Sequence, residues 1–270
     1  MAVARVPIIT LLTDFGTKDH FVAAIKGVIL TIAPQVQIVD ISHEVPPHDI
    51  LEAGFILRAC YSQFPSRTIH MVVVDPTVGS PRKSLIVATD NYYYIAPDNG
   101  VLSLIYDVDP VSTVVGIASE HLMLPEVSKT FHGRDIFAPA AAWLARRTDM
   151  LNFGDPITEY VRMPLPKAKI VGEGMVKGTV IHVDRFGNLV TNISREDYQA
   201  AREKVPGDVF KVLLAKQEIT ELKEYYAEAQ KGETIALFGS SNLLEIAQNQ
   251  GSASRTLGVA RGAEVGLLLK

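Results

Sequence analysis

The chain has 270 residues, of which 47% are hydrophobic and 21% charged, as in a globular protein of roughly two domains. Its 26 basic and 30 acidic residues give a net charge of −4, which does not favour nucleic acid or an anionic membrane as a partner. The single cysteine, Cys60, excludes an internal disulfide, fits a reducing compartment and is predicted to be a buried thiol. The sequence shows neither a signal peptide nor an apolar segment of the ~18 residues that a membrane span needs, so we expect a cytoplasmic protein.

The first half of the sequence alternates between predicted strands and helices. Apolar, β-branched runs predict strands at 8–13, 36–41, 69–74, 85–89, 92–96 and 114–117. Amphipathic patterns predict helices at 20–33, 50–61, 101–107 and 136–147. This order favours parallel pairing, so we expect a layered α/β domain with a mostly parallel sheet at residues 1–160.

The second half is dominated by short strands. A proline-rich stretch without periodicity marks the change, and we assign the linker to residues 161–172. Beyond it, strands are predicted at 175–182, 189–193, 209–214, 234–238 and 265–269, with short helices at 197–203 and 222–229. Residues 173–270 are therefore expected to form a smaller, β-rich, barrel-like domain.

Two acidic residues follow buried strands of the first half. Asp75 ends the apolar run 69–74, and Arg82 follows after a turn; Asp14 ends the run 8–13. Ligands of open α/β sheets bind at the carboxyl ends of the strands, where a carboxylate can hold a ribose diol. The alternatives are that Asp75 and Arg82 pair across a turn and that Asp14 caps the next helix, a role that Asp19 can also fill.

Further polar residues gather in loops of the first half. The densest group of potential metal ligands is Asp40, His43, Glu44, His48 and Asp49. Its spacing is not His-Glu-x-x-His, so a capping or solvated loop competes with a metal-dependent hydrolase site. His132 precedes a predicted helix, where it faces either a cleft or a structural partner.

The second domain has two candidate loops. Asp184, Phe186 and Asn188 lie in a turn between two predicted strands, and this turn can be purely structural. A Phe beside Asp and Asn also suits a flat base or the polar end of an amino acid. Ser240 lies in a similar loop, with Glu245 shortly after it.

Read together, these segments resemble the adenosine-forming S-adenosylmethionine hydrolases, also called S-adenosylmethionine hydroxide adenosyltransferases, which are relatives of the fluorinating and chlorinating enzymes. The resemblance covers nearly the whole chain and depends on eight motifs in the same order. They are Thr13-Asp14-Phe15-Gly16, Lys26-Gly27-Val28-Ile29, Asp40-Ile41-Ser42-His43, Asp75-Pro76-x-Val78-Gly79, Ala96-Pro97-Asp98-Asn99-Gly100, Phe131-His132-Gly133-Arg134-Asp135, Asp184-x-Phe186-Gly187-Asn188 and Thr191-Asn192.

The resemblance implies an enzyme that hydrolyses S-adenosyl-L-methionine to adenosine and L-methionine without a cofactor or metal. By position, Asp75, Arg82 and His132 match the residues with which the hydrolytic members handle the attacking water. The halide-using relatives depart from this set, and the fluorinating type carries a long insertion where this chain has the short turn 89–92. Both features point to water as the nucleophile.

The resemblance also implies roles in substrate binding. Asp14 would bind the ribose hydroxyls, with Pro47 near the base and Phe186 and Asn188 flanking adenine. Asp184, Ser240 and Glu245 would hold the methionine part. Family members resemble homotrimers, with the active site between the first domain of one subunit and the second domain of its neighbour. The alternatives are a non-catalytic binding protein for S-adenosylmethionine or a nucleoside, and a halide-using relative that forms 5′-halo-adenosine.

Overall fold

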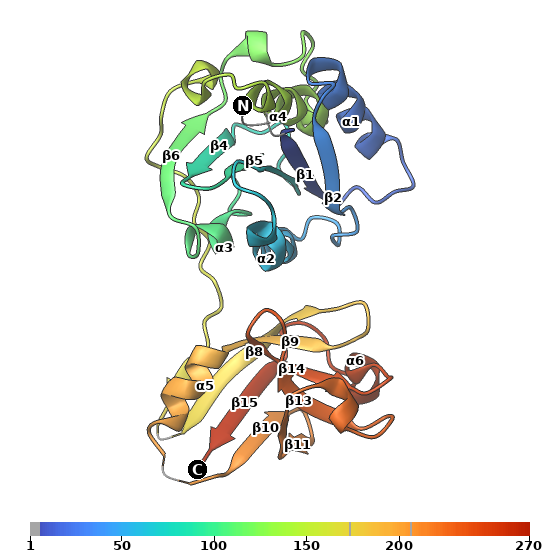
Figure 1. Cartoon of the computed structure of the whole chain (residues 1–270), viewed down its shortest axis with the longest axis vertical. Helices are drawn as coiled ribbons and strands as arrows, with labels where there is room; N and C mark the ends of the chain where they lie inside the picture. The colour runs from blue at the N-terminus through green and yellow to red at the C-terminus, as the bar shows by residue number, and fades with distance from the viewer. Residues whose placement is uncertain (1–5, 173, 206) are drawn as a thin grey trace, which may run out of the picture. The chain divides into compact units, whose positions relative to one another are not determined.

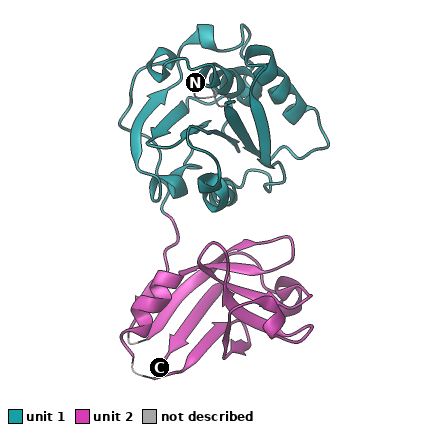
Figure 2. Ribbon diagram, viewed as in Figure 1, with its two compact units in different colours: residues 1–164 teal, residues 165–270 magenta. Residues whose placement is uncertain are grey.

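The structure is a computed structural model that describes residues 6–172, 174–205 and 207–270 (Figure 1). The first five residues of the predicted first domain, residue 173 at the start of the predicted second domain and residue 206 within it lie outside the described residues. The chain divides into two compact units between Pro164 and Leu165 (Figure 2).

Unit 1 is built on a six-stranded sheet with the order β2-β1-β3-β5-β4-β6. The strands are β1 (Ile8–Thr13), β2 (Gln37–Ser42), β3 (Ile69–Val73), β4 (Ser84–Thr89), β5 (Tyr93–Pro97) and β6 (Val111–Gly116). The pairs β1–β2, β1–β3 and β3–β5 are parallel, whereas β4 pairs antiparallel with β5 and β6. The predicted mostly parallel sheet is confirmed.

Helices cover both faces of this sheet, in agreement with the continuous burial of β3 (Figure 1). On one face, Met71 and Val73 of β3 share a core with α1 (Phe21–Ile32) and α4 (Ala138–Ala145). On the other face, Val72 shares a core with α2 (Ile50–Cys60) and the short α3 (Ser103–Tyr106). The elements that complete unit 1 are the 3₁₀ turns Tyr61–Gln63, Glu120–Leu122 and Met150–Phe153 and the π-helical turn Gly133–Phe137.

Two expectations for unit 1 need correction. The helix predicted at 136–147 is preceded without a break by the π-helical turn Gly133–Phe137, so the helical backbone starts directly after His132. The Cys60 thiol is half-buried and not fully buried, because α2 ends at this residue. Its partial burial still raises the pKa of the thiol to about 11, which leaves it protonated and unreactive at neutral pH.

Unit 2 is a curled, mainly antiparallel sheet with the order β11-β10-β15-β8-β9-β14-β13-β12, and β7 also pairs with β8. The strands are β7 (Lys169–Val171), β8 (Met175–Val183), β9 (Leu189–Ser194), β10 (Phe210–Leu214), β11 (Gln217–Ile219), β12 (Leu222–Lys223), β13 (Thr234–Phe238), β14 (Leu243–Gln248) and β15 (Glu264–Leu269). β11 also contacts β13, which brings the two ends of the strand order together. The predicted β-rich, barrel-like form is therefore confirmed.

Helices of unit 2 are short. α5 (Arg195–Arg202) starts with a capping box in which the side chains of Ser194 and Asp197 each accept a backbone N–H of the other residue. α6 (Ala253–Leu257) was not predicted. The helix predicted at 222–229 is wrong: Leu222–Lys223 forms β12 beside β13, and Tyr226–Glu228 is a 3₁₀ turn. Pairing with β13 overrides the helical propensity of this segment.

Candidate active site

The first site residue, Asp75, lies two residues beyond the carboxyl end of β3. The chain leaves the sheet through Val74, which is fully buried and whose carbonyl accepts a hydrogen bond from Asn99 Nδ2 at 2.8 Å. The Asp75 side chain is only 5% exposed. A carboxylate is thus held in a nearly dry environment at the sheet edge where α/β folds bind ligands.

Arg82 neutralises this carboxylate through two hydrogen bonds. Arg82 Nε donates to Asp75 Oδ1 at 3.1 Å, and Arg82 Nη2 donates to Asp75 Oδ2. The guanidinium is 7% exposed, lies over the Phe137 ring and donates through Nη1 to Ser84 Oγ at 3.0 Å. This forked arrangement fixes the plane of both groups.

His132 contacts the same guanidinium. Its Nδ1 lies 2.9 Å from Arg82 Nη2. Because an arginine has only donors, Nδ1 is the acceptor, and the proton of the neutral imidazole is on Nε2. Burial, followed by the positive charge of Arg82, lowers the pKa of His132, so the ring is neutral at neutral pH. Asp75, Arg82 and His132 thus form one contact group, in which the Arg82 guanidinium bonds to both of the other side chains.

The loop between Asp75 and Arg82 depends on Gly79. This residue has φ of +81°, and a Cβ atom there would lie 2.2 Å from the carbonyl oxygen of Lys129. The Asp75 loop is therefore packed directly on the backbone that leads to His132. No side chain larger than hydrogen fits at this contact.

Asp14 lies at the same sheet edge, because β1 and β3 are parallel neighbours with Thr13 opposite Val73. Its Oδ2 accepts a hydrogen bond from the backbone N–H of His48 at 2.8 Å, and its side chain is 9% exposed. Pro47 is exposed beside that contact. Asp14 does not cap α1, whose N-cap is His20.

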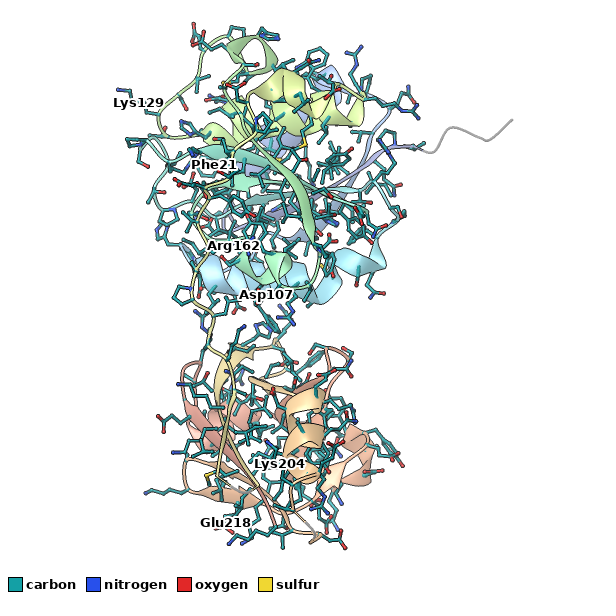
Figure 3. All side chains as sticks on the ribbon, turned by 90° about the vertical axis from the view of Figure 1, so that its left-hand side faces the viewer. Phe21, Asp107, Lys129, Arg162, Lys204 and Glu218 are labelled. Atoms are coloured by element: carbon teal, nitrogen blue, oxygen red, sulfur yellow. The ribbon has the colours of Figure 1, made fainter. Side chains whose placement is uncertain are left out.

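Three aromatic rings connect the Asp14 loop to the His132 segment. Phe21, labelled in Figure 3, has its ring centroid 5.6 Å from Phe15 and 5.2 Å from Phe131, and Phe15 and Phe131 are 5.9 Å apart. Phe15 follows Asp14, and Phe131 precedes His132. The contacts of Phe131 are edge-to-face and that between Phe15 and Phe21 is tilted, and together they hold the two polar loops beside each other.

Three of the residues considered as metal ligands, Asp40, His43 and Asp49, are engaged in other contacts. Asp49 caps α2 by accepting the Glu52 N–H at 3.1 Å, and Lys26 Nζ lies 2.6 Å from Asp40 Oδ2. The His43 ring contacts Thr13, and the His48 ring is largely exposed. Within the part of the chain that the structure describes, no group of three or more His, Cys, Asp or Glu side chains is arranged to hold a metal ion.

In unit 2, Asp184 organises its own turn. Its Oδ1 accepts the backbone N–H groups of Phe186 and Asn188 at 2.9 and 2.8 Å, and its Oδ2 accepts Asn188 Nδ2 at 2.8 Å. The turn is thus structural, as the alternative interpretation proposed. It also leaves the Phe186 ring 75% exposed, so the ring is accessible to a ligand or a partner.

Glu245 on β14 is a buried carboxylate of unit 2, whereas Asp184 is only partly buried. Burial raises its pKa; the hydrogen bond from Tyr226, 3.1 Å long, opposes this shift, and the charge of Asp184 adds to it. The carboxylate packs against Gly239, where a Cβ atom would lie 1.8 Å from Glu245 Oε1. Ser240, the next residue, is exposed in the β13–β14 turn.

Sequence reasoning missed three polar neighbours of the predicted residues. Thr77 donates to Asp75 Oδ1 through both its backbone N–H, at 3.3 Å, and its hydroxyl, at 3.2 Å. Ser84 Oγ accepts a hydrogen bond from Arg82 Nη1, and the Tyr226 hydroxyl donates a hydrogen bond to Glu245. A Thr two residues after a strand-end Asp is a local signal for such a turn, whereas the Tyr226 contact is long-range and leaves no local signal.

Comparison with known families agrees with both units. The sequence model described as "SAM hydroxide adenosyltransferase N-terminal domain" matches residues 9–154, and the corresponding C-terminal domain model matches residues 178–266. In the described part of the chain, no helix is both long and apolar enough to span a membrane.

Curated relatives are similar over almost the full length. A protein of Methanocaldococcus jannaschii named (R)-S-adenosyl-L-methionine hydrolase is 34% identical, and the alignment covers 93% of this chain and 92% of the relative. A Thermus thermophilus protein of the same name is 33% identical, with 95% and 98% covered. A fluorinase of Actinoplanes is 29% identical over 72% of this chain and 74% of its own.

A solved structure has the same fold. The crystal structure of an uncharacterized conserved protein from Thermotoga maritima superposes with a TM-score of 0.90 at 36% identity, covering 97% of this chain and 100% of that chain. A conserved hypothetical protein from Thermus thermophilus superposes with a TM-score of 0.78 at 30% identity, covering 98% of this chain and 100% of that chain.

Proposed function

The chain belongs to the SAM hydroxide adenosyltransferase family, and we propose that it hydrolyses S-adenosyl-L-methionine to adenosine and L-methionine. Curated relatives at 31–34% identity carry the hydrolase name. The observation that carries the proposal is the dry contact group of Asp75, Arg82 and His132 at the ligand edge of the unit 1 sheet.

The reaction suits a site without a strong acid. Water attacks the ribose 5′ carbon, the carbon–sulfur bond breaks, and the sulfonium leaves as the neutral thioether of methionine. The leaving group therefore needs no proton. The protein contributes most by aligning a partly desolvated water with the carbon–sulfur bond, which lowers the barrier by several kcal/mol.

Hydrogen-bond capacity assigns a role to each member of the group. Asp75 Oδ1 already accepts from Arg82 and Thr77, whereas among the described residues Oδ2 accepts from Arg82 alone, so Oδ2 has room for a water proton. His132 Nδ1 accepts from Arg82, so Nε2–H is a donor and not a base. Asp75 thus orients the water and takes its proton, while Arg82 fixes the carboxylate and His132.

The remaining predicted residues are proposed to bind the substrate. Asp14 accepts the ribose hydroxyls, with Pro47 near the base. In unit 2, the exposed Phe186 ring and the side chain of Asn188 flank adenine. Asp184, Ser240 and Glu245 hold the methionine part, where a carboxylate attracts the ammonium group.

We further propose that the protein works as a homotrimer with each active site assembled between the first unit of one subunit and the second unit of its neighbour. The separation of the predicted residues into a catalytic group on unit 1 and an exposed aromatic group on unit 2 supports this arrangement. The cytoplasmic location and the absence of a cofactor, both expected from the sequence, stay predictions.

The test is chromatography of S-adenosyl-L-methionine incubated with the enzyme, with each sulfonium epimer used separately because the relatives are named for the (R) form. Adenosine and methionine in equal amounts are expected, and activity should persist in a chelator. A 5′-halo-adenosine formed with added chloride would instead show a halide-using enzyme. Tight binding by calorimetry without any product would show a binding protein.

A further inference from the structure

His43 links the Asp14 loop to the end of β2. It follows β2 directly and is 6% exposed. Its ring Nδ1 lies 2.9 Å from the hydroxyl of Thr13, the residue before Asp14, and its backbone carbonyl accepts the Gly16 N–H at 2.7 Å. One residue thus contacts the chain on both sides of Asp14.

The donors and acceptors around the His43 ring define one direction for the hydrogen bonds between Thr13 and His43. The backbone N–H of Phe15 donates to Thr13 Oγ1 at 3.3 Å, and the Asp40 carboxylate, which can only accept, faces Nε2 of the ring, so Nδ1 is the nitrogen that accepts the Thr13 hydroxyl proton. The remaining ring proton is then on Nε2, 3.1 Å from Asp40 Oδ1, although this contact is bent and not a well-aligned hydrogen bond. Lys26 is the last group in this series of contacts, with its Nζ 2.6 Å from Asp40 Oδ2.

The charges of Lys26 and Asp40 stabilise this arrangement of donors and acceptors. Burial would raise the pKa of Asp40, but the hydrogen bond from Lys26 and the close His43 ring hold it below its ordinary value. Asp40 is therefore a carboxylate that attracts the Nε2–H of His43, which keeps Nδ1 as the acceptor for Thr13. The direction of these contacts, from Lys26 through Asp40 and His43 to Thr13, fixes the Thr13 hydroxyl and the backbone at Asp14.

We propose that His43, oriented by Asp40 and Lys26, is a positioning residue that holds Asp14 for the ribose hydroxyls through Thr13. The inference depends on the proposed function, because it assigns the ribose contact to Asp14. Asp14 Oδ2 is already held by the His48 N–H, so a fixed Thr13 backbone is what remains to set the direction of the other carboxylate oxygen.

The same strand supplies a matched control. Thr10 Oγ1 lies 2.8 Å from Nδ1 of His70, which is a second buried Thr–His pair on β1. It lies on the other face of the strand and three residues earlier, so it has no contact with Asp14. Thr10→Val and Thr13→Val therefore each remove a buried Thr–His bond, but only Thr13→Val acts next to the proposed ribose site. Thr13→Val also removes the 3.3 Å contact from the Phe15 N–H, which a substitution at Asp40 leaves in place.

The experiment measures the affinities of adenosine and 2′,3′-dideoxyadenosine for the full-length protein by calorimetry. Hydrogen bonds to a charged group predict that the wild-type protein binds adenosine roughly 30-fold more tightly. In Thr13→Val this ratio should fall to about threefold, while dideoxyadenosine binds within about twofold of wild type. Thr13→Ser and Thr10→Val should keep the wild-type ratio.

Asp40→Asn provides a second variant at a partly exposed position, where folding is not at risk. Like Thr13→Val, it should lower the ratio of the adenosine and dideoxyadenosine affinities, by about threefold. An unchanged ratio in both Thr13→Val and Asp40→Asn, or an equal loss in Thr10→Val, would overturn the role of His43. If the wild-type protein itself does not distinguish the two nucleosides, the ribose role of Asp14 fails, and this inference fails with it.

Discussion

Asp75 is the residue whose charge the proposed chemistry needs most. Asp75→Asn keeps the shape of the side chain but removes the negative charge that Arg82 neutralises and the oxygen that accepts the water proton. We expect kcat to fall at least about 100-fold while KM changes less than about threefold, because the residue acts on the water and not on the substrate.

Asp90→Asn is the matched control for this change. Asp90 lies in the turn after β4, at the opposite end of that strand from Arg82, where its side chain accepts a hydrogen bond from the Ser112 hydroxyl at 3.2 Å. The kcat of the Asp90→Asn variant should stay at the wild-type value. If Asp75→Asn retained turnover within about threefold, the assignment of proton transfer to Asp75 would be wrong.

His70 shows what a buried imidazole does to stability. It is fully buried between Thr10, Phe64, Tyr92 and Tyr94, and burial lowers its pKa from 6.5 to about 3. The unfolded chain therefore binds a proton below pH 6.5 that the folded protein takes up only near pH 3. Stability from this residue is present above pH 6.5 and is lost as the pH falls through that window.

The prediction is a difference between the wild-type protein and His70→Gln. Between pH 7 and pH 5, the free energy of unfolding of the wild-type protein should fall by about 2 kcal/mol more than that of the variant. Urea denaturation at both pH values measures it, and His43→Gln controls for the loss of a different buried imidazole. Equal losses in wild type and His70→Gln would show that His70 titrates normally in the folded state.

At the level of single residues, the sequence predicted which site residues end strands, but not what they contact. Asp14 and Asp75 follow apolar runs, and the physics of parallel sheets places such residues at one edge. The contact between Arg82 and His132 joins residues 50 positions apart, and only the fold determines it. Family resemblance supplied this pairing because it carries tertiary information that local patterns lack.

Among the elements, the loop from Asp75 to Arg82 is set by backbone geometry. Gly79→Ala would place a methyl group 2.2 Å from the Lys129 carbonyl in a left-handed conformation. We expect it to lower the free energy of unfolding by about 1–3 kcal/mol and to reduce kcat, because the loop carrying Asp75 must move away from the His132 segment.

Gly27→Ala is also a glycine-to-alanine substitution, but we expect it to raise the stability of the protein and not to lower it. Gly27 lies exposed within α1, and a Cβ atom there meets nothing within 4 Å. It should raise stability by about 0.5–1 kcal/mol and leave kcat unchanged. Thermal denaturation and assays of both variants compare the two effects; a neutral Gly79→Ala would contradict the packing of this loop.

Predictability also differed between elements. Buried parallel strands such as β1 and β3 were predicted because their apolar runs are short, contain β-branched residues and end at turn residues, which favours a strand over a buried helix. The segment 222–229 was predicted wrongly because its helical composition competes with pairing to β13, a contact that periodicity does not encode. β14 was missed for the related reason that it is stabilised by pairing with β9 and β13 more than by its own pattern.

For the whole molecule, the proposed trimer places the catalytic and adenine-binding groups of one site on different chains. Light scattering should therefore give three times the 29.5 kDa chain mass. The stronger test is complementation between two inactive variants, Asp75→Asn on unit 1 and Asn188→Ala on unit 2. Each alone should form inactive trimers.

Mixed trimers formed by co-expression in equal amounts should regain activity. A site with both native groups arises when the unit 1 of an Asn188→Ala chain meets the unit 2 of an Asp75→Asn chain, which happens at about a quarter of sites in a head-to-tail ring. Roughly 25% of wild-type turnover is therefore expected. If each site were built within one chain, no combination would restore Asp75 and Asn188 to the same site, and the mixture would be as inactive as its parents.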